Sequence, residues 1–375
     1  MILVSLLIVY ILFIWLQGWI YRRYWSQNLD VKLRFSTPTG VEGGTIRLTE
    51  QITSRKILPL PWLTVKFQVS RFLVFPDNLH ATISDDYYRE DLFSLGIYQR
   101  INRNLTVLLN KRGYYTIKSI DLVSSDLLLT SKLVSHMTSQ SVLTVCPRLI
   151  SREDLLIPYR QLIGQVLTRQ SLLPDPFEFR TIREYQGFDN LRSINWMATA
   201  RTGQLKVNVH EATASREIRI LLNVEPDGTF YDELLIEDEI RIAASICTYA
   251  AEDGVSCSLC SNAPDILTGE RVDVAAGQSI QHIQQIQEQL GRLDLSRPAV
   301  SFTGILDQVP QPRMNEPVLL LISLNCSSEL CRKWDSCLDL GYKGTWIVPR
   351  FPAWQTRIPE TENPVFFWEV RPNGS

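Results

Sequence analysis

The feature that most constrains this chain is an apolar run at its N-terminal end. Residues 1–16 read MILVSLLIVYILFIWL, and apolar residues continue to the basic pair at 22–23. About 20 apolar residues in a helix cross the hydrocarbon core of a bilayer, so residues 1–25 are expected to form a transmembrane anchor. Amphipathic rings prefer the headgroup layer, and they gather at one end of the run: Trp15, Trp19, Tyr21, Tyr24 and Trp25.

The basic residues also indicate how the helix is oriented. Arg22 and Arg23 follow the apolar run and no basic residue precedes it, so the positive-inside rule places the C-terminal side in the cytoplasm. A cleaved secretory signal is the alternative, but a charged n-region and a small-residue cleavage site are missing. No later stretch approaches 18 uninterrupted apolar residues. We therefore expect a single-pass protein of the plasma (inner) membrane with its remaining domains in the cytoplasm.

Composition limits the class of the remaining chain. Roughly 350 residues follow the anchor, which suggests two domains. Hydrophobic content of 45% permits sizeable cores, and a formal charge of -2 argues against nucleic acid as a main partner. The odd number of cysteines, seven, fits reduced thiols in a cytoplasmic protein better than a disulfide framework.

Short alternating segments dominate residues 30–147. VKLRF, TIRLTEQI, LTVKFQV, NLTVLLN, YYTIKSIDLV and SVLTV carry β-branched or aromatic residues at period two, with Gly- and Pro-containing turns between them. This pattern predicts an antiparallel β-sandwich domain.

Residues 148–350 follow a different pattern, in which apolar strands alternate with helices. Strands are expected at EIRILLNV, GVSCSLC, VLLLISL and TWIVP. Helices are expected between them at 233–252, 280–290 and 329–340. Such alternation predicts an α/β domain with a mainly parallel sheet covered on both faces. Residues 351–375 form a Pro- and aromatic-rich tail, in which VFFWEV is a possible edge strand.

The segment 179–209, within the α/β domain, is unusually polar for a core element. A helix is expected from an N-cap at Asp189 to about Ala200, with Ile194 on its apolar face and Gly203 as the left-handed C-terminal residue. The polar side chains form either an internal Arg–carboxylate network or a recognition surface, and they are Arg183, Asp189, Arg192, Asn195 and Arg201.

This segment resembles the family known as domain of unknown function 58. Members carry Arg-Glu-Tyr, a Pro-Gly-Asp turn, Arg, Ile-x-Trp and Ala-Arg-Thr. The matching residues are Arg183-Glu184-Tyr185, Asp189, Arg192, Ile194-Asn195-Trp196 and Ala200-Arg201-Thr202. Gly187 and Phe188 stand where the family usually has Pro and Gly. Lys111-Arg112-Gly113-Tyr114 and Val145-Cys146-Pro147-Arg148 are similar to two further family motifs, so the resemblance covers most of the chain.

The resemblance implies a membrane-attached β domain followed by a von Willebrand factor A-like domain, with no general enzymatic activity. Such proteins are often encoded beside MoxR-type AAA ATPases. We therefore expect a non-enzymatic interaction or scaffold protein that works with such an ATPase in an assembly or chaperone-like system. The expected docking surface or inter-domain joint comprises Arg183, Glu184, Tyr185, Asp189, Arg192, Asn195, Trp196 and Arg201.

Von Willebrand factor A domains can bind a divalent cation through an Asp-x-Ser-x-Ser loop after the first strand. The corresponding positions here are Asn223, Glu225 and Asp227, and none is the family's ligand type. The end of the later strand reads Ser323-Leu324-Asn325, where an Asp is expected. We therefore predict a degenerate loop without metal, and no cofactor. A metal-dependent adhesion domain remains a third, weaker alternative.

An enzyme is the main alternative class. A membrane-proximal hydrolase or transferase needs a Cys or Ser nucleophile beside a His, and only pairs distant in sequence provide one. Cys257 and Cys260 lie three apart on an expected strand, so they face opposite sides and are expected to be core thiols. His210 ends a strand pattern and is expected to be structural.

Overall fold

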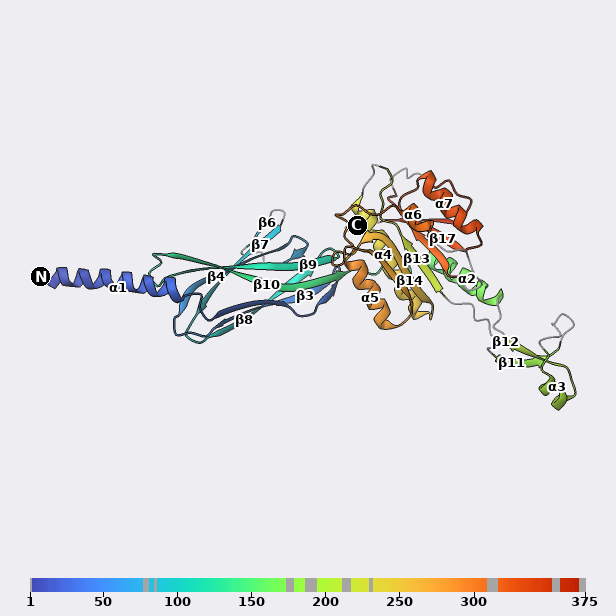
Figure 1. The fold of residues 1–375 in the computed structure, drawn as a ribbon, viewed down its shortest axis with the longest axis horizontal. Helices are drawn as coiled ribbons and strands as arrows, with labels where there is room; N and C mark the ends of the chain where they lie inside the picture. The colour runs from blue at the N-terminus through green and yellow to red at the C-terminus, as the bar shows by residue number, and fades with distance from the viewer. Residues whose placement is uncertain are drawn as a thin grey trace. The chain divides into compact units, whose positions relative to one another are not determined.

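The computed structural model describes residues 2–76, 81–83, 86–172, 179–185, 194–210, 217–228, 232–308, 316–352 and 358–370. The chain is a mixed α/β protein with one long apolar helix at its N-terminal end and several sheets (Figure 1). It divides into two units, Met1–Arg148 and Leu149–Ser375.

Helix α1 (Ile2–Tyr24) begins the first unit. Its candidate membrane span, Leu3–Tyr24, is long and apolar enough to cross a bilayer, and almost none of it is buried in protein. The last turns of the helix differ, because Gln17, Tyr21 and Trp25 are buried against the β strands. The helix is therefore exposed along most of its length and docked at its C-terminal end.

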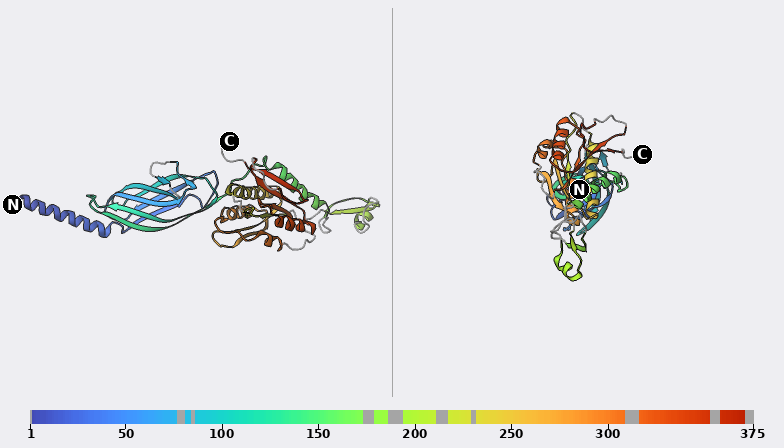
Figure 2. Two further views of the ribbon diagram at one scale, coloured as in Figure 1. Left: turned by 90° about the horizontal axis from the view of Figure 1, so that it is seen from above. Right: turned by 90° about the vertical axis from the view of Figure 1, so that its right-hand side faces the viewer.

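The strands of the first unit form two mainly antiparallel sheets, which lie face to face (Figures 1 and 2). Among the described strands, one sheet has the order β1-β3-β8-β5 and the other has the order β2-β10-β9-β4-β7-β6, with β2 and β10 parallel. The strands are β1 (Leu29–Phe35), β2 (Thr39–Val41), β3 (Thr45–Ser54), β4 (Leu60–Ser70), β5 (Leu73–Val74), β6 (Ala81–Ile83), β7 (Asp86–Leu95), β8 (Arg100–Leu109), β9 (Gly113–Ser125) and β10 (Lys132–Cys146).

Alternate residues of both sheets point into one hydrophobic cluster, as the period-two pattern requires. A charged cluster is buried with them. Glu50 on β3 and Asp91 on β7 come from different sheets, and both are fully buried. Asp91 forms ion pairs with Arg89 (Nε–Oδ2 2.6 Å) and with Arg103 of β8 (NH1–Oδ1 2.7 Å). Buried charges persist only when they are paired, and this cluster links the two sheets.

The second unit contains a sheet with the order β15-β14-β13-β16-β17-β18, in which all neighbours are parallel except β14 and β15. A separate antiparallel pair joins β11 and β12. The elements are α2 (Leu156–Leu172), β11 (Phe179–Glu184), α3 (Trp196–Thr202), β12 (Lys206–His210), β13 (Glu217–Leu222), α4 (Glu233–Glu252), β14 (Ser256–Pro264), β15 (Arg271–Gly277), α5 (Ile280–Gly291), α6 (Phe302–Leu306), β16 (Val318–Ile322), α7 (Ser328–Asp339), β17 (Gly344–Arg350) and β18 (Val365–Glu369).

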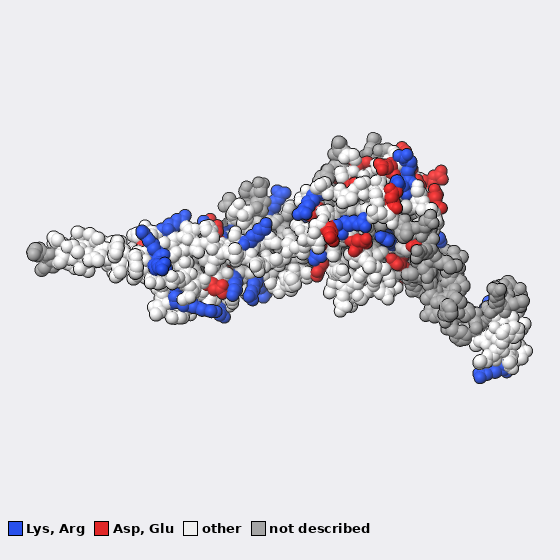
Figure 3. All heavy atoms as spheres, in the orientation of Figure 1, with Lys and Arg blue, Asp and Glu red and all other residues white. Residues whose placement is uncertain are grey.

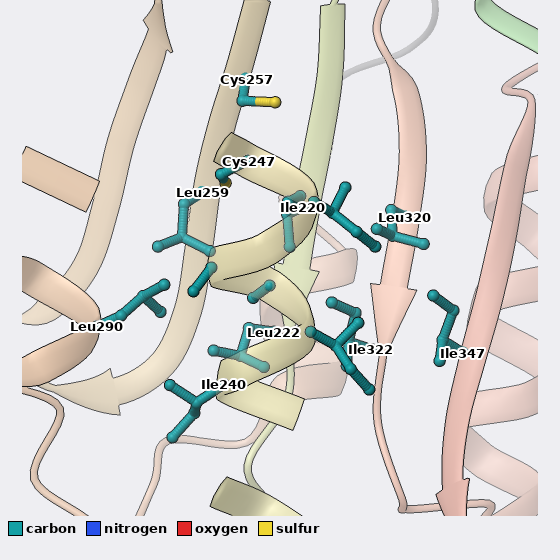
Figure 4. Packing of buried hydrophobic residues seen from close by; sticks show 14 of the residues in the cluster. Ile220, Leu222, Ile240, Cys247, Cys257, Leu259, Leu290, Leu320, Ile322 and Ile347 are labelled. Atoms are coloured by element: carbon teal, nitrogen blue, oxygen red, sulfur yellow. The ribbon is translucent and has the colours of Figure 1, made fainter. Parts of the chain in front are cut away.

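Helices cover both faces of this sheet, so its central strands are largely buried, and β16 is apolar at every position. On one face, Ile220 and Leu222 of β13 pack with α2, α4 and α5; Figure 4 shows Ile240 of α4 and Leu290 of α5 in this cluster. On the other face, Leu221 packs with α6 and α7. The mainly parallel arrangement that the sequence predicts is therefore present.

The expected helices at 233–252, 280–290 and 329–340 correspond to α4, α5 and α7. The expected edge strand in VFFWEV is β18, which pairs in parallel with β17 at the sheet edge. Strand β15 was not expected. It is the antiparallel neighbour of β14 at the opposite edge, with an irregular register.

The cysteines lie where their strand and helix positions place them. All seven are buried thiols, and none of them forms a disulfide. Cys257 joins the cluster on the α4 face, whereas Cys260 joins the cluster on the α7 face. Burial raises the pKa of the Cys260 thiol, which makes it a poor nucleophile. The two side chains face opposite sides of the sheet, as predicted for residues three apart on a strand, so their sulfurs cannot share a ligand.

Candidate functional site

Two places in the second unit contain the residues that the sequence singles out. The first is the polar segment around β11, α3 and β12. The second is the edge of the main sheet where β13, β14 and β16 end, which is where open α/β sheets usually bind ligands.

The polar segment is a strand pair that carries a short helix. Arg183 and Glu184 of β11 pair with Val207 and Lys206 of β12, and the Lys206 Nζ lies 3.2 Å from Glu184 Oε1. The Tyr185 N–H donates to the Leu205 carbonyl at 2.9 Å. The three residues of the Arg-Glu-Tyr motif are therefore held along one strand.

Helix α3 begins later than the sequence predicts. Ile194 forms a β-bridge with Val207, and the Asn195 N–H donates to the Lys206 carbonyl at 2.8 Å. These contacts hold Ile194 and Asn195 in extended backbone, so the expectation that Ile194 lies on a helix face is wrong. Asn195 is the N-cap instead, and its Oδ1 accepts the Ala198 N–H at 2.9 Å.

The other end of α3 agrees with its expected signals. Gly203 has φ 71°, a left-handed conformation, and its N–H donates to the Thr199 carbonyl at 2.9 Å. Arg201 lies in the last turn and is exposed. Asp189 and Arg192, two of the predicted site residues, lie outside the described residues.

The side chains of α3 face solvent. None of its residues is buried, and Trp196 and Met197 are 68% and 73% exposed. Its attachment to β12 is polar, because the Lys206 N–H donates to Thr199 Oγ1 at 3.0 Å. The structure thus holds an exposed Trp-Met pair on a capped helix that is hydrogen-bonded to a strand pair.

The second place is a group of neutral side chains at the carboxyl ends of the parallel strands, which we name the amide network: Asn223, Asn262 and Ser323. Asn223 is fully buried; its Nδ2 donates to Ser323 Oγ at 3.0 Å, and its Oδ1 accepts from Asn262 Nδ2 at 2.8 Å. The Glu225 N–H also donates to Asn223 Oδ1, at 3.0 Å. Asn262 Oδ1 accepts the Val224 N–H at 3.0 Å.

These hydrogen bonds bear on the loop that the sequence predicts to be degenerate and without metal, at Asn223, Glu225 and Asp227. Mg²⁺ and Ca²⁺ require oxygen ligands, usually carboxylates. Here the Asn223 amide directs its N–H donors at Ser323, and both of its polar atoms are engaged. Glu225 Oε2 accepts the Phe302 N–H at 3.1 Å, and Asp227 is half-buried farther along the loop. This donor set does not fit a divalent cation.

Electrostatics favour neutral groups at this edge. Burial and then the charge of Glu329 raise the pKa of Glu225, against the effect of its hydrogen bond from Phe302. Glu239 of α4 is fully buried below the edge and accepts the Leu324 N–H; burial raises its pKa well above the usual range. The Asn325 Nδ2 donates to the Pro226 carbonyl at 3.2 Å, which joins the loops after β13 and β16.

Sequence reasoning missed Asn262 and Glu239 in this arrangement. Both elements also contain other polar residues, among them Ser258 and Ser261 of β14 and Glu237 and Asp238 of α4, so nothing local singles out Asn262 or Glu239. Their partners lie far along the chain, and only the fold brings them together.

Two histidines contact groups that lie near them in the fold. The His282 Nε2 lies 2.9 Å from the Cys257 carbonyl oxygen, and His136 Nδ1 lies 2.6 Å from Asp121 Oδ1 on the protein surface. His210 ends β12, as expected.

Comparison with known proteins gives one family. Residues 181–344 match the family model described as "Protein of unknown function DUF58", which supports the family resemblance for the part of the chain that contains both places. No curated protein matches the chain.

Solved structures give low similarity. A non-cellulosomal cohesin from the hyperthermophilic archaeon Archaeoglobus fulgidus is 9% identical, with a TM-score of 0.23, and the match covers 34% of this chain and 97% of the cohesin. The CARDB domain of a Pyrococcus furiosus protein, in complex with di-metal ions, is 11% identical with a TM-score of 0.21, covering 32% of this chain and 90% of the domain. At these TM-scores the similarity carries no argument about fold or function.

Proposed function

We propose that this protein is a membrane-anchored interaction protein that holds a partner-binding α/β domain at the cytoplasmic face of the inner membrane. In this proposal α1 is a single-pass anchor, residues 30–147 form a β-sandwich, and the second unit is von Willebrand factor A-like. The partner is a protein, and a MoxR-type AAA ATPase is the candidate that the family resemblance suggests.

The apolar surface of α1 supports the anchor. Its side chains from Leu3 to Leu16 are mostly exposed in the protein, and burying them in lipid removes the cost of hydrating them. Arg22 and Arg23 follow directly and favour a cytoplasmic location for what comes after them.

The amide network supports a binding role that does not depend on metal. In von Willebrand factor A domains a cation at this edge can be completed by a partner's carboxylate. Hydrogen bonds among Asn223, Asn262 and Ser323 fix the same strand ends here without a cation. Recognition is then expected to depend on other side chains.

The observation that carries the proposal is the exposed pair Trp196 and Met197. Trp and Met are enriched where protein surfaces meet partners, and Trp is typical of the few residues that dominate binding energy. A capped helix presents the pair, so little conformational entropy is lost when a partner covers it.

The test measures binding of the purified full-length protein to the MoxR-type ATPase encoded in the same genome. A Trp at the centre of an interface contributes about 2 kcal/mol or more, so Trp196→Ala is expected to weaken binding by roughly 30-fold. The matched control is Ile280→Ala, which removes an exposed apolar side chain (79% exposed) from α5 of the same unit. Equal affinities of the two variants and the unaltered protein would refute the docking role of the segment.

A further inference from the structure

Two loops of the first unit, residues 55–59 and 126–131, contact the last turns of α1, and a third, residues 96–99, contacts the first of them; we name the three the collar. The Tyr21 hydroxyl donates to the Pro59 carbonyl at 2.8 Å. The Gln17 Nε2 donates to Asp126 Oδ2 at 2.9 Å. The second loop contacts the first, because the Tyr98 N–H donates to the Lys56 carbonyl at 3.1 Å. The collar therefore lies beside residues 17–25 of the helix.

Buried polar contacts hold the collar against α1. Lys56 is buried and its ammonium donates to the backbone carbonyls of Trp25 and Tyr24, at the negative end of the helix. Asp126 is fully buried; burial would raise its pKa, but hydrogen bonds from Thr130, Gln17 and Ser131 lower the pKa below its usual value. The loops and the helix end are thus one ordered structure.

The tips of the collar loops are apolar and exposed. Exposed large apolar side chains normally occur singly on soluble proteins, whereas a contiguous group marks a contact surface. Each of the three loops contributes to the group, which consists of Ile57, Ile97, Tyr98, Leu127, Leu128 and Leu129. Tyr98 and Leu129 also have positive φ (48° and 58°), a conformation that costs backbone energy for side chains of this size.

Basic side chains surround these tips. Arg22, Arg23, Arg55 and Lys132 are exposed, and the acidic residue within the collar loops, Asp126, is buried in its hydrogen bonds. Figure 3 shows that the outer part of α1 carries neither basic nor acidic side chains and that basic side chains appear where the helix meets the strands. Apolar tips framed by Lys and Arg are the pattern of proteins that insert into an anionic membrane surface.

We infer that the collar is a second membrane-contacting element: its apolar tips enter the interfacial layer of the leaflet that α1 crosses, and its basic residues bind anionic phospholipid headgroups. This inference rests on the proposed anchor and adds a site that the anchor alone does not require.

The depth at which the collar meets the helix favours lipid over a protein partner as the contact of the collar. The candidate span extends to Tyr24, and the collar contacts begin at Gln17, so the two overlap by about two turns. Exposed Trp15 and Trp19 mark the same level as headgroup depth. Any surface held beside these residues of a spanning helix faces lipid.

A hollow between α1 and the collar has a volume of about 570 Å³. Its lining includes Ile20 and Tyr24 of the helix and Arg55, Ile57 and Tyr98 of the loops. The exposed Arg55 guanidinium suits the phosphate of a phospholipid headgroup, and the apolar and aromatic walls suit the first carbons of its acyl chains.

The experiment places a polarity-sensitive fluorophore on single cysteines of the full-length protein in vesicles. The seven native thiols are buried, so a thiol reagent selects the introduced one. Leu128→Cys and Tyr98→Cys report on two collar loops. Val41→Cys, exposed at the opposite end of the strands beside Cys146, is the matched control, and Leu7→Cys reports on the helix.

We expect the labels at positions 128 and 98 to behave like the label at position 7: their emission is blue-shifted and a nitroxide lipid quenches it. Iodide in the aqueous phase is expected to quench only the label at position 41. Adding phosphatidylglycerol to phosphatidylcholine vesicles should strengthen the lipid quenching at the two collar sites. If both collar labels behave like the Val41 label while the Leu7 label is in lipid, the collar inference is overturned and the anchor stands. If the Leu7 label is also in water, the anchor itself fails, and the collar inference fails with it.

Discussion

The buried charged cluster of the first unit should make its stability depend on pH through one residue, Glu50. Burial, and then the nearby Asp91 carboxylate, raise the pKa of Glu50 from 4.5 to about 8, although Arg103 and Arg89 act in the opposite direction. The carboxyl is therefore protonated in the folded protein at neutral pH and ionised in the unfolded chain. We predict that Glu50→Gln, which keeps the neutral shape, removes this dependence.

The sign and size follow from proton linkage. Between pH 4.5 and 8 the folded state binds one more proton than the unfolded state, so the free energy of unfolding falls as pH rises. The slope for one proton is about 1.4 kcal/mol per pH unit, and the whole window amounts to roughly 3–5 kcal/mol. The Glu50 contribution is fully present below pH 4.5 and is lost by about pH 8. The Gln variant should match the unaltered protein at low pH and exceed its stability at pH 8.5.

Urea unfolding of the full-length protein in detergent tests this, with hydrogen-exchange mass spectrometry of β3 and β7 peptides so that the first unit is followed separately. The matched control is Glu90→Gln, which neutralises an exposed carboxylate on β7 that pairs with Lys66. The control should retain the slope of the unaltered protein. An unchanged slope in Glu50→Gln would show that Glu50 does not carry the pH dependence, and the reasoning from its burial would be wrong.

Two further substitutions probe the other buried polar contacts. Lys56→Met removes the ammonium that donates to the Trp25 carbonyl. We expect hydrogen exchange in the last turn of α1 to accelerate about tenfold, which corresponds to about 1.4 kcal/mol. The control Lys66→Met, on the exposed side of β4, should leave this exchange rate unchanged. Asn262→Ala removes one hydrogen-bond acceptor and two donated hydrogen bonds from the amide network, so the free energy of unfolding of the second unit, measured in urea, should fall by about 2–4 kcal/mol. Asn325 is half-buried in the adjoining loop, and Asn325→Ala should lower that free energy by about 1 kcal/mol. Equal losses would contradict the central role of Asn262.

Periodicity predicted much of the second unit because its signals are local. Helix α4 has the expected bounds, Glu233–Glu252, since the Asp232 side chain caps its first turn and apolar residues recur along its length. Strand β16 is apolar at every position, and a strand buried on both faces needs such a run.

The errors arose where distant residues decide the local conformation. Leu191, Ile194 and Ala198 have helical spacing in the sequence, yet backbone hydrogen bonds with β12 hold Ile194 and Asn195 in extended conformation. Tertiary hydrogen bonds outweigh a helix propensity of a few tenths of a kcal/mol per residue. The amide network was hidden for the same reason: Asn223 meets residues 39 and 100 positions away in sequence.

In the proposed function, the hydrogen-bonded amide network limits what the carboxyl edge of the sheet can contribute to binding. A metal would let a partner's carboxylate form a strong, directional bond there, whereas neutral side chains that satisfy one another offer an incoming group little. Binding energy must then come from exposed side chains, and Trp196 and Met197 provide a large apolar surface in the same unit. We therefore predict that the proposed partner binding is insensitive to chelators and depends on the helix that carries Trp196.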